Sequence, residues 1–265
     1  MNKYEKVNNA MWDELTDVHF KSYGVDKFKS GISTLDEIQI REIGSVDGKS
    51  MLHLQCHFGL DSLSWAREGA IVTGIDFVQK AIAYANGLRD ELNLKARFIC
   101  CNIYDLEKHL NEQFDFVYTS QGVLCWLKDI KEWGNLIARY LKPGGIFYMM
   151  ESHPITHIFE DTIKGELRII HPYFHDDIPT KWDDAYPDYS DPTYIKKNPS
   201  YEWKWTISDI VNALIEAGLR IEFINEYNRT FCKLLPDMVH REDGWWYLPG
   251  YEKRLPLVFT IRARK

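Results

Sequence analysis

Hydrophobic and polar residues in the middle of this chain follow two alternating patterns. From residue 50 onward, short runs rich in β-branched and aromatic residues are separated by longer segments with helical spacing of apolar positions. The short runs are MLHLQ, AIVTGID, ARFICC, FDFVYTS and GIFYMMES. Strands that alternate with helices connect through right-handed crossovers, so the pattern predicts a parallel sheet covered by helices on both faces.

The pattern differs on either side of this region. Residues 1–48 are polar, with a partly helical spacing of apolar positions, and we expect an N-terminal helical segment. Residues 155–205 carry repeated prolines and many aromatic side chains, which is too aromatic for a disordered linker. A segment of this length inside a compact domain is often functional, so we expect an inserted cap over the sheet.

A regular pattern returns after the cap. TISDIVNALIEAGLRIEFINEY predicts a helix capped by Thr206 or Ser208 and ended by Gly218, followed by a strand. The last strand is expected in LPLVFTIRARK, as a hairpin partner of the strand before it. Together these elements suggest an antiparallel edge on the parallel sheet. The predicted α/β core therefore comprises residues 49–154 and 206–265.

Composition narrows the class of partner. The formal net charge is −7 over 265 residues, and an acidic surface repels the phosphates of nucleic acid. No apolar run approaches the roughly 20 residues that span a bilayer, and the N-terminal residues lack the apolar core of a signal peptide. Five cysteines without a CxxC pair are typical of free thiols in a reducing compartment. We expect a cytoplasmic protein without nucleic-acid or membrane partners.

Several residues at the predicted strand ends suit a nucleotide-type cofactor. In open α/β sheets, ligands bind at the carboxyl ends of the strands. The first strand runs into HLQCHFG, where Gly59 can take a positive φ before the next helix begins. Asp76 ends the second strand, and its carboxylate can accept both hydroxyls of a ribose. The amide of Asn102, after the third strand, suits the polar edge of an adenine. The apolar side chains of Phe77 and Ile103 suit the two faces of the adenine ring.

The order of these signals resembles the class I S-adenosylmethionine-dependent methyltransferases. The first loop of that family typically reads VLDLGCGTG, and here it reads MLHLQCHFG. Cys56 and Gly59 match, His53 stands where an acidic residue is usual, and Gln55 and His57 replace two glycines. This variant loop resembles that of a bacterial subgroup to which we attach no substrate.

The later signals strengthen the resemblance. The second family signal matches VTGIDF, which contains Asp76. The third matches FICCNIYDL, with Asn102 where aspartate is common in the family. The fourth matches the segment from FDFVYTS through the LKPGG turn. The resemblance implies a seven-stranded, doubly wound, mostly parallel Rossmann-like sheet that binds S-adenosylmethionine. It implies these cofactor-binding residues: His53, Gln55, His57, Gly59, Asp76, Phe77, Asn102, Ile103, Ser120 and Gln121.

Methyl transfer also needs an aligned nucleophile, and often a base that removes its proton. Glu151 and His153 end the strand GIFYMMESH and are the candidate catalytic residues, although His153 can equally hydrogen-bond within the cap. Candidate substrate-binding residues are Tyr118 at the fourth strand, with Tyr173 and His175 in the cap. We expect a small-molecule acceptor, with oxygen, nitrogen, sulfur and carbon nucleophiles all open.

Three alternatives accompany this interpretation. Histidines pair in the cap as His153 with His157 and His171 with His175, but packing on aromatic residues is the simpler role, and no metal is predicted. An NAD-dependent oxidoreductase needs three spaced glycines, of which the loop supplies one. A non-catalytic protein that binds S-adenosylmethionine as a scaffold or sensor would show the same cofactor residues.

Overall fold

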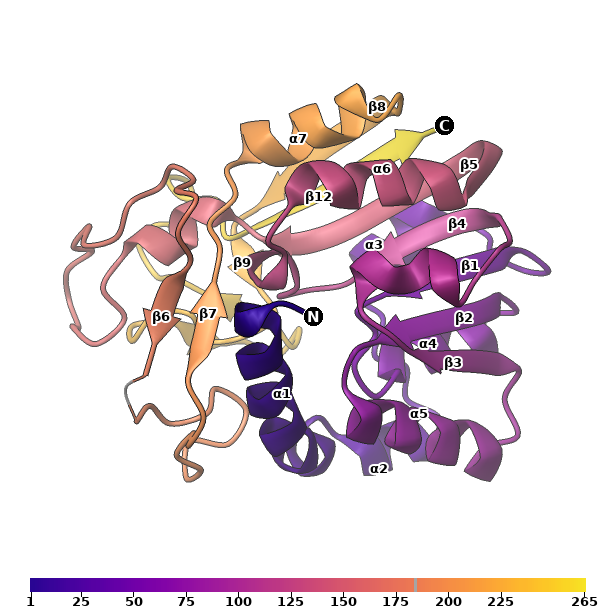
Figure 1. Cartoon of the computed structure of the whole chain (residues 1–265). Coiled ribbons are helices and arrows are strands. Elements are labelled where there is room, and N and C mark those ends of the chain that lie inside the picture. Colours follow the sequence, from indigo (N-terminus) through magenta and orange to yellow (C-terminus); the bar gives the residue numbers. More distant parts are fainter. Residues whose placement is uncertain (184) are drawn as a thin grey trace.

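A seven-stranded sheet forms the centre of the protein (Figure 1). The computed structural model describes residues 1–183 and 185–265. In spatial order the strands are β3 (Ala96–Cys100), β2 (Ile71–Asp76), β1 (Ser50–Leu54), β4 (Phe114–Thr119), β5 (Leu141–Ser152), β12 (Val258–Arg264) and β8 (Arg220–Tyr227). The first five pair in parallel, and β12 runs antiparallel to both β5 and β8. The predicted fold class is confirmed.

Helices cover both faces of the sheet. These are α3 (Glu37–Ile43), α4 (Leu60–Arg67), α5 (Gln79–Glu91), α6 (Ile130–Tyr140) and α7 (Ile207–Glu216). Two further helices, α1 (Lys3–Ser22) and α2 (Val25–Lys29), precede them in the chain. Shorter 3₁₀ turns are η1 (Ile103–Lys108), η2 (Leu124–Trp126) and η3 (Pro154–Ile158). The α7 helix begins at the predicted Thr206 cap, whose hydroxyl accepts from the Asp209 N–H.

The core lies on both sides of the sheet. On one face, α6, α7 and η1 pack on the strands and bury Trp133 and Phe147 completely. On the other face, α3 and α4 pack around Trp65 and Tyr148, and α5 packs against Phe98. Because the central strands are buried on both faces, their sequences are nearly continuous apolar runs without clear alternation.

The cap contains a small antiparallel pair, β6 (Thr180–Trp182) and β7 (Ser200–Glu202). In Figure 1, α1 lies between this pair and the carboxyl ends of the central strands. The Asn8 side chain of α1 donates to the Tyr201 carbonyl at 2.8 Å and accepts from the Tyr201 N–H at 2.7 Å. Asn8 therefore pairs with the backbone of β7 much as a neighbouring strand would.

A second insertion separates β8 from β12. It holds β9 (Arg229–Thr230), β10 (Val239–His240) and β11 (Trp246–Tyr247), which form a three-stranded sheet of their own. Leu235, Met238 and Leu257 from this region bury themselves against Phe159 and Leu167 of the cap. Residues 229–257, which we assigned to the core from the sequence, thus pack partly with the cap and partly with the core, the latter through Trp245 and Tyr247.

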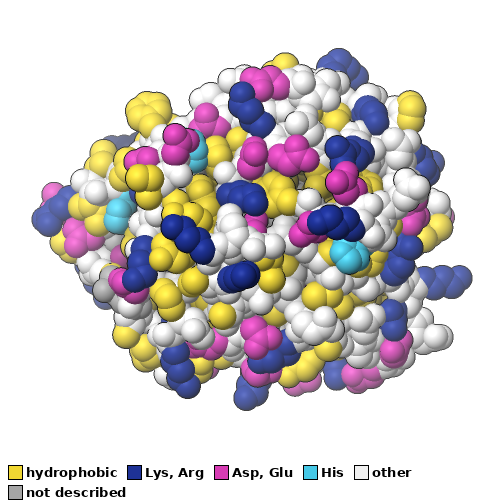
Figure 2. Space-filling view, viewed as in Figure 1, with side chains coloured by type: hydrophobic (Ala, Val, Ile, Leu, Met, Phe, Trp, Pro, Cys, Tyr) yellow, Lys and Arg dark blue, Asp and Glu magenta, His cyan; other side chains and the backbone are white. Residues whose placement is uncertain are grey.

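The outer surface has mixed charge. On the face shown in Figure 2, acidic and basic side chains are interspersed among polar and apolar ones. Among the described residues, no helix is both long and apolar enough to cross a membrane.

Candidate active site

A cavity of about 790 Å³ opens at the carboxyl ends of the central strands. Its size falls within the range of small-molecule sites. Side chains from α1, the HLQCHFG loop, the ends of β2 and β5, the cap and the second insertion line it. Glu151 and Tyr173 line the cavity. So do all ten predicted cofactor residues, which are His53, Gln55, His57, Gly59, Asp76, Phe77, Asn102, Ile103, Ser120 and Gln121.

Two non-glycine residues of the HLQCHFG loop adopt backbone angles that are usual for glycine. Gln55 and His57 take φ values of 55° and 51°, in the left-handed region where glycine is usual. A side chain in this region costs roughly 1–2 kcal/mol. The His57 N–H donates to the Asp76 carboxylate at 2.9 Å, which joins the loop to the end of β2. The loop is therefore held in this shape by its hydrogen bonds and packing, at a cost in backbone strain.

Gly59 is a position in this loop where a larger residue would clash. Its φ is +77°, and a Cβ atom there would lie 2.7 Å from the Phe98 ring. We expect Gly59→Ala to lower the free energy of unfolding by about 2–4 kcal/mol, through backbone strain and overpacking. Gly87→Ala is the matched control, since Gly87 is exposed in α5 with open space around its Cβ position. Urea denaturation should show Gly87→Ala equal to or more stable than the wild type. Equal stability of the wild type and Gly59→Ala would contradict this role.

His53 is buried at the floor of the cavity, where the resembled family has an acidic residue. Its Nδ1 lies 2.7 Å from the Ser62 hydroxyl and its Nε2 lies 3.0 Å from the Ser120 hydroxyl. Burial lowers the pKa of His53 to about 3, so the ring is neutral and one nitrogen donates while the other accepts. With both nitrogens engaged, His53 acts by holding Ser120 at the cavity wall.

Asp76 presents a carboxylate at the edge of the cavity. One oxygen accepts from the His57 N–H and the other from the Val78 N–H, both at 2.9 Å. Burial raises the pKa of Asp76 to about 6, so the group is ionised at neutral pH. A carboxylate has about four lone-pair positions, and two remain for hydroxyl donors of a ligand.

Asn102 lies across the cavity floor from the loop. Its side-chain oxygen accepts from the Tyr104 N–H at 2.9 Å and caps the start of η1. Within the described part of the chain its amide nitrogen makes no hydrogen bond, so two N–H donors remain for a ligand.

Glu151 reaches the cavity, but its carboxylate is already occupied. It accepts from the backbone N–H groups of Gly122 at 2.7 Å, Val123 at 2.8 Å, Leu124 at 3.2 Å and Ser152 at 2.8 Å. These bonds hold the loop after β4 against the end of β5. Burial raises the pKa of Glu151, while the four N–H donors favour its ionised form. This geometry fits loop positioning better than the predicted catalytic role.

The other predicted catalytic residue, His153, does not line the cavity. Its Nε2 lies 3.0 Å from a carboxylate oxygen of Glu226 on β8, and its Nδ1 accepts from the Ile155 N–H at the start of η3. Desolvation lowers the pKa of His153 despite the opposing effect of Glu226. The alternative role within the cap fits this geometry, and the catalytic assignment does not.

Two predicted substrate residues also lie away from the cavity. Tyr118 is completely buried, with its hydroxyl bonded to the Gln39 amide at 2.5 Å and the Asp61 carboxylate at 3.2 Å. His175 stacks on Trp205 at 3.9 Å and bonds to the Lys204 carbonyl at 2.8 Å. Both side chains therefore stabilise the fold, while Tyr173 stays at the wall.

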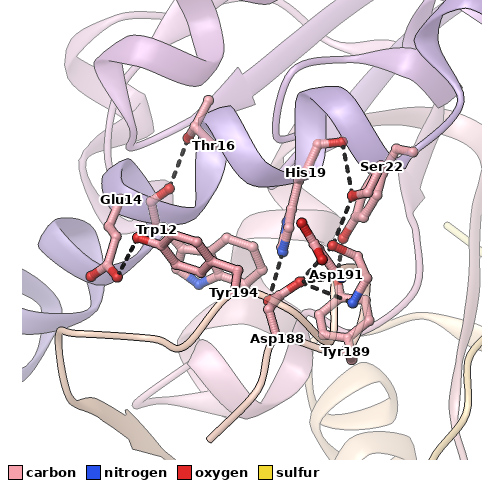
Figure 3. Close-up of polar contacts among 11 residues, drawn as sticks. Trp12, Glu14, Thr16, His19, Ser22, Asp188, Tyr189, Asp191 and Tyr194 are labelled. Atoms are coloured by element: carbon pink, nitrogen blue, oxygen red, sulfur yellow. Dashed lines mark hydrogen bonds and ion pairs between the residues drawn. The ribbon is translucent and has the colours of Figure 1, made fainter. Parts of the chain in front are cut away.

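A wall beside the cofactor loop comes from α1, the residue that follows it and the cap. Trp12 of α1 and Tyr23, the residue after α1, line the cavity together with Asp188 and Tyr189 of the cap. Figure 3 shows Trp12, Asp188 and Tyr189. Trp126 of η2 lies edge-on to Trp12, with ring centres 5.3 Å apart. Segments about 170 residues apart build this wall, and such contacts leave no periodic signal in the sequence. Across the described residues, no group of three or more His, Cys, Asp or Glu side chains is arranged to hold a metal ion.

Comparison with known proteins agrees with this geometry. Residues 52–149 match a family model described as a methyltransferase domain. This segment of the chain, from β1 to β5, is similar to a methyltransferase domain. Its fold is similar to that of an S-adenosylmethionine-dependent methyltransferase from Mesorhizobium loti, with a TM-score of 0.60 at 22% identity over 86% of this chain and 96% of that one. The partial match supports the predicted methyltransferase family, and the structural likeness shows that the fold is shared.

Curated relatives of this methyltransferase domain match over shorter stretches. The ubiquinone biosynthesis O-methyltransferase of Pseudomonas syringae pv. tomato is 28% identical over 159 residues, which are 59% of this chain and 65% of the relative. Phosphoethanolamine N-methyltransferase 1 of Triticum aestivum is 23% identical over 151 residues, 56% of this chain and 30% of the relative. The chain thus spans less than two thirds of each relative. One relative is named as an O-methyltransferase and the other as an N-methyltransferase.

Proposed function

We propose that the protein transfers a methyl group from S-adenosylmethionine to a small-molecule acceptor. The observation that carries the proposal is one continuous cavity that joins the cofactor loop to the wall of α1 and cap residues. Because α1 and the cap cover the strand ends, the space admits a small molecule more readily than a polymer chain. Relatives named for ubiquinone biosynthesis and phosphoethanolamine methylation support this class of acceptor.

The residues at the cavity floor fit the cofactor. Asp76 has lone pairs for the ribose hydroxyls, and Asn102 has amide donors for the adenine edge beside Ile103. The buried side-chain oxygen of Gln55 has no partner within the described residues and lies where the methionine part would bind. Bound there, S-adenosylmethionine supplies an electrophilic methyl group. The protein's own part is to exclude water and to hold the acceptor in line.

Cofactor affinity is expected to fall as the pH drops below about 6, because burial raises the pKa of Asp76 to about 6. The ionised carboxylate accepts ribose hydroxyls, and protonation removes its charge. Linkage then predicts that the association constant falls by up to about tenfold per pH unit below this value and is nearly flat above it. Calorimetric titration of S-adenosylhomocysteine between about pH 5 and pH 8 measures this profile. A flat profile throughout would place the ribose elsewhere.

Calorimetry also tests the proposal as a whole. We expect S-adenosylhomocysteine to bind with one site per chain and NAD to show no saturable binding. Tight binding of NAD without binding of S-adenosylhomocysteine would favour the oxidoreductase alternative.

A second candidate is a non-catalytic protein that binds S-adenosylmethionine. The hydrogen bonds that occupy Glu151 and His153 favour it, because they leave neither group as a free base. Incubation with S-adenosylmethionine and fractionated small metabolites separates the two candidates. Formation of S-adenosylhomocysteine in any fraction supports the enzyme, and binding without product in every fraction supports the second candidate.

A further inference from the structure

The wall beside the cofactor loop is held together by polar contacts between α1 and the cap, of which the His19–Asp188 pair is buried (Figure 3). The Glu14 carboxylate of α1 accepts from the Tyr194 hydroxyl at 2.9 Å and from the Lys197 N–H at 2.8 Å in the cap. His19 Nε2 lies 3.0 Å from the Asp188 carboxylate, and these side chains are 0% and 3% exposed. Helix α1 and this part of the cap therefore form one firm surface.

The charged group on this surface is saturated. Besides His19, Asp188 accepts from the Ser190 N–H at 2.9 Å, the Ser190 hydroxyl at 2.5 Å and the Asp191 N–H at 3.2 Å. Burial opposes its ionisation, but the hydrogen bonds from His19 and Ser190 outweigh burial and lower the pKa of Asp188 to about 2. The wall consequently offers a ligand no unpaired acidic charge near the cofactor loop.

A pair of tyrosine hydroxyls on this wall keeps a hydrogen-bond donor free for a ligand. Tyr23 and Tyr189 hydrogen-bond to each other through their hydroxyls. That bond uses one of their two protons, and within the described residues neither hydroxyl has another hydrogen-bond partner. Tyr189 lines the cavity with 54% of its surface accessible. Burial raises the pKa of the Tyr23 hydroxyl, so this group is neutral.

Flat aromatic surfaces surround this pair beside the cofactor loop. The Tyr23 ring centre lies 6.1 Å from that of His57 and 5.6 Å from that of Phe58. Trp12 is edge-on to both His57 and Trp126, with centres 5.3 Å apart in each case. A ligand here meets ring faces and edges together with one neutral donor.

We propose that the Tyr23–Tyr189 hydroxyl pair, with Trp12 and Trp126, binds an aromatic acceptor that carries a neutral hydroxyl group. The proposal rests on the proposed function, since it names the acceptor class of the same cavity. A free donor on the pair bonds the acceptor oxygen, and the aromatic wall orients the ring toward the cofactor loop. Tyr23 and Tyr189 thus determine acceptor specificity, and we expect their replacement with phenylalanine to leave cofactor affinity unchanged.

Catechol is the probe, titrated calorimetrically into the complex of the full chain with S-adenosylhomocysteine. We expect saturable binding that Tyr189→Phe weakens roughly fivefold, the effect of one neutral hydrogen bond. Tyr201→Phe is the matched control, because this cap tyrosine lies outside the cavity. Ethanolamine, an amine without a ring, should show no saturable binding. If circular dichroism shows that Tyr189→Phe is unfolded, Tyr23→Phe replaces it, and the same roughly fivefold loss of catechol affinity is expected.

Different results overturn different claims. Equal catechol affinity in wild type and Tyr189→Phe, absence of catechol binding, or tighter binding of ethanolamine would each overturn the acceptor class. S-adenosylhomocysteine is titrated alone first, and its failure to bind would instead remove the proposed function.

Discussion

Replacement of Asp76 with alanine is expected to weaken S-adenosylhomocysteine binding by about 1.5–3 kcal/mol, or roughly 10- to 150-fold. The carboxylate is ionised at neutral pH, lies at the cavity edge, and keeps lone pairs beyond those used by the His57 and Val78 N–H groups. Alanine at this position would remove both charge-assisted hydrogen bonds that the carboxylate can accept from the ribose hydroxyls. Calorimetry at neutral pH measures the change.

Two further variants separate binding from folding. Asp76→Asn keeps one acceptor oxygen and the side-chain shape, and should lie between wild type and Asp76→Ala. Asp90→Asn removes an acidic charge from the exposed side of α5, where the side chain is 70% accessible, and should bind as wild type does. Wild-type affinity in both Asp76 variants would show that the ribose is held by other groups.

Glu151→Ala is expected to lower the free energy of unfolding by about 3–5 kcal/mol, because removing one partner of a buried charged network is costly. The substitution leaves the N–H groups of Gly122, Val123 and Leu124 without their acceptor beneath the cap. Urea denaturation monitored by circular dichroism measures this change.

Glu151→Gln sharpens the distinction between positioning and proton transfer. Glutamine keeps one acceptor oxygen, so it should lose a smaller part of the stability, with methyl transfer reduced only as far as the loop is disturbed. A general base predicts the reverse, namely normal stability and abolished transfer in both variants. Unchanged stability of Glu151→Ala would contradict the positioning role.

The sheet and the cofactor edge could be predicted from the sequence because both depend on local signals. Apolar strand runs, helical spacing and turn residues determine where each element lies, and parallel strands bring their carboxyl ends to one edge. Asp76 and Asn102 follow directly from those ends. The loop shape at Gln55 and His57 was anticipated only through the resemblance, since both residues take a φ that glycine usually occupies.

The catalytic and substrate residues could not be predicted in the same way. Glu151 and His153 do end β5 as expected, but their partners decide their roles, and Glu226 lies 73 residues from His153 in sequence. The Tyr23–Tyr189 wall joins positions 166 residues apart. The second insertion was missed because its strands are only two residues long, too short to show alternation.

A crystal structure with S-adenosylhomocysteine bound tests the central claim most directly. We expect the ribose on the Asp76 carboxylate, the adenine beside Asn102, and the sulfur facing the Tyr23–Tyr189 wall across open cavity space. Density for the ligand outside this cavity, or a sulfur turned away from the α1 and cap wall, would contradict the account.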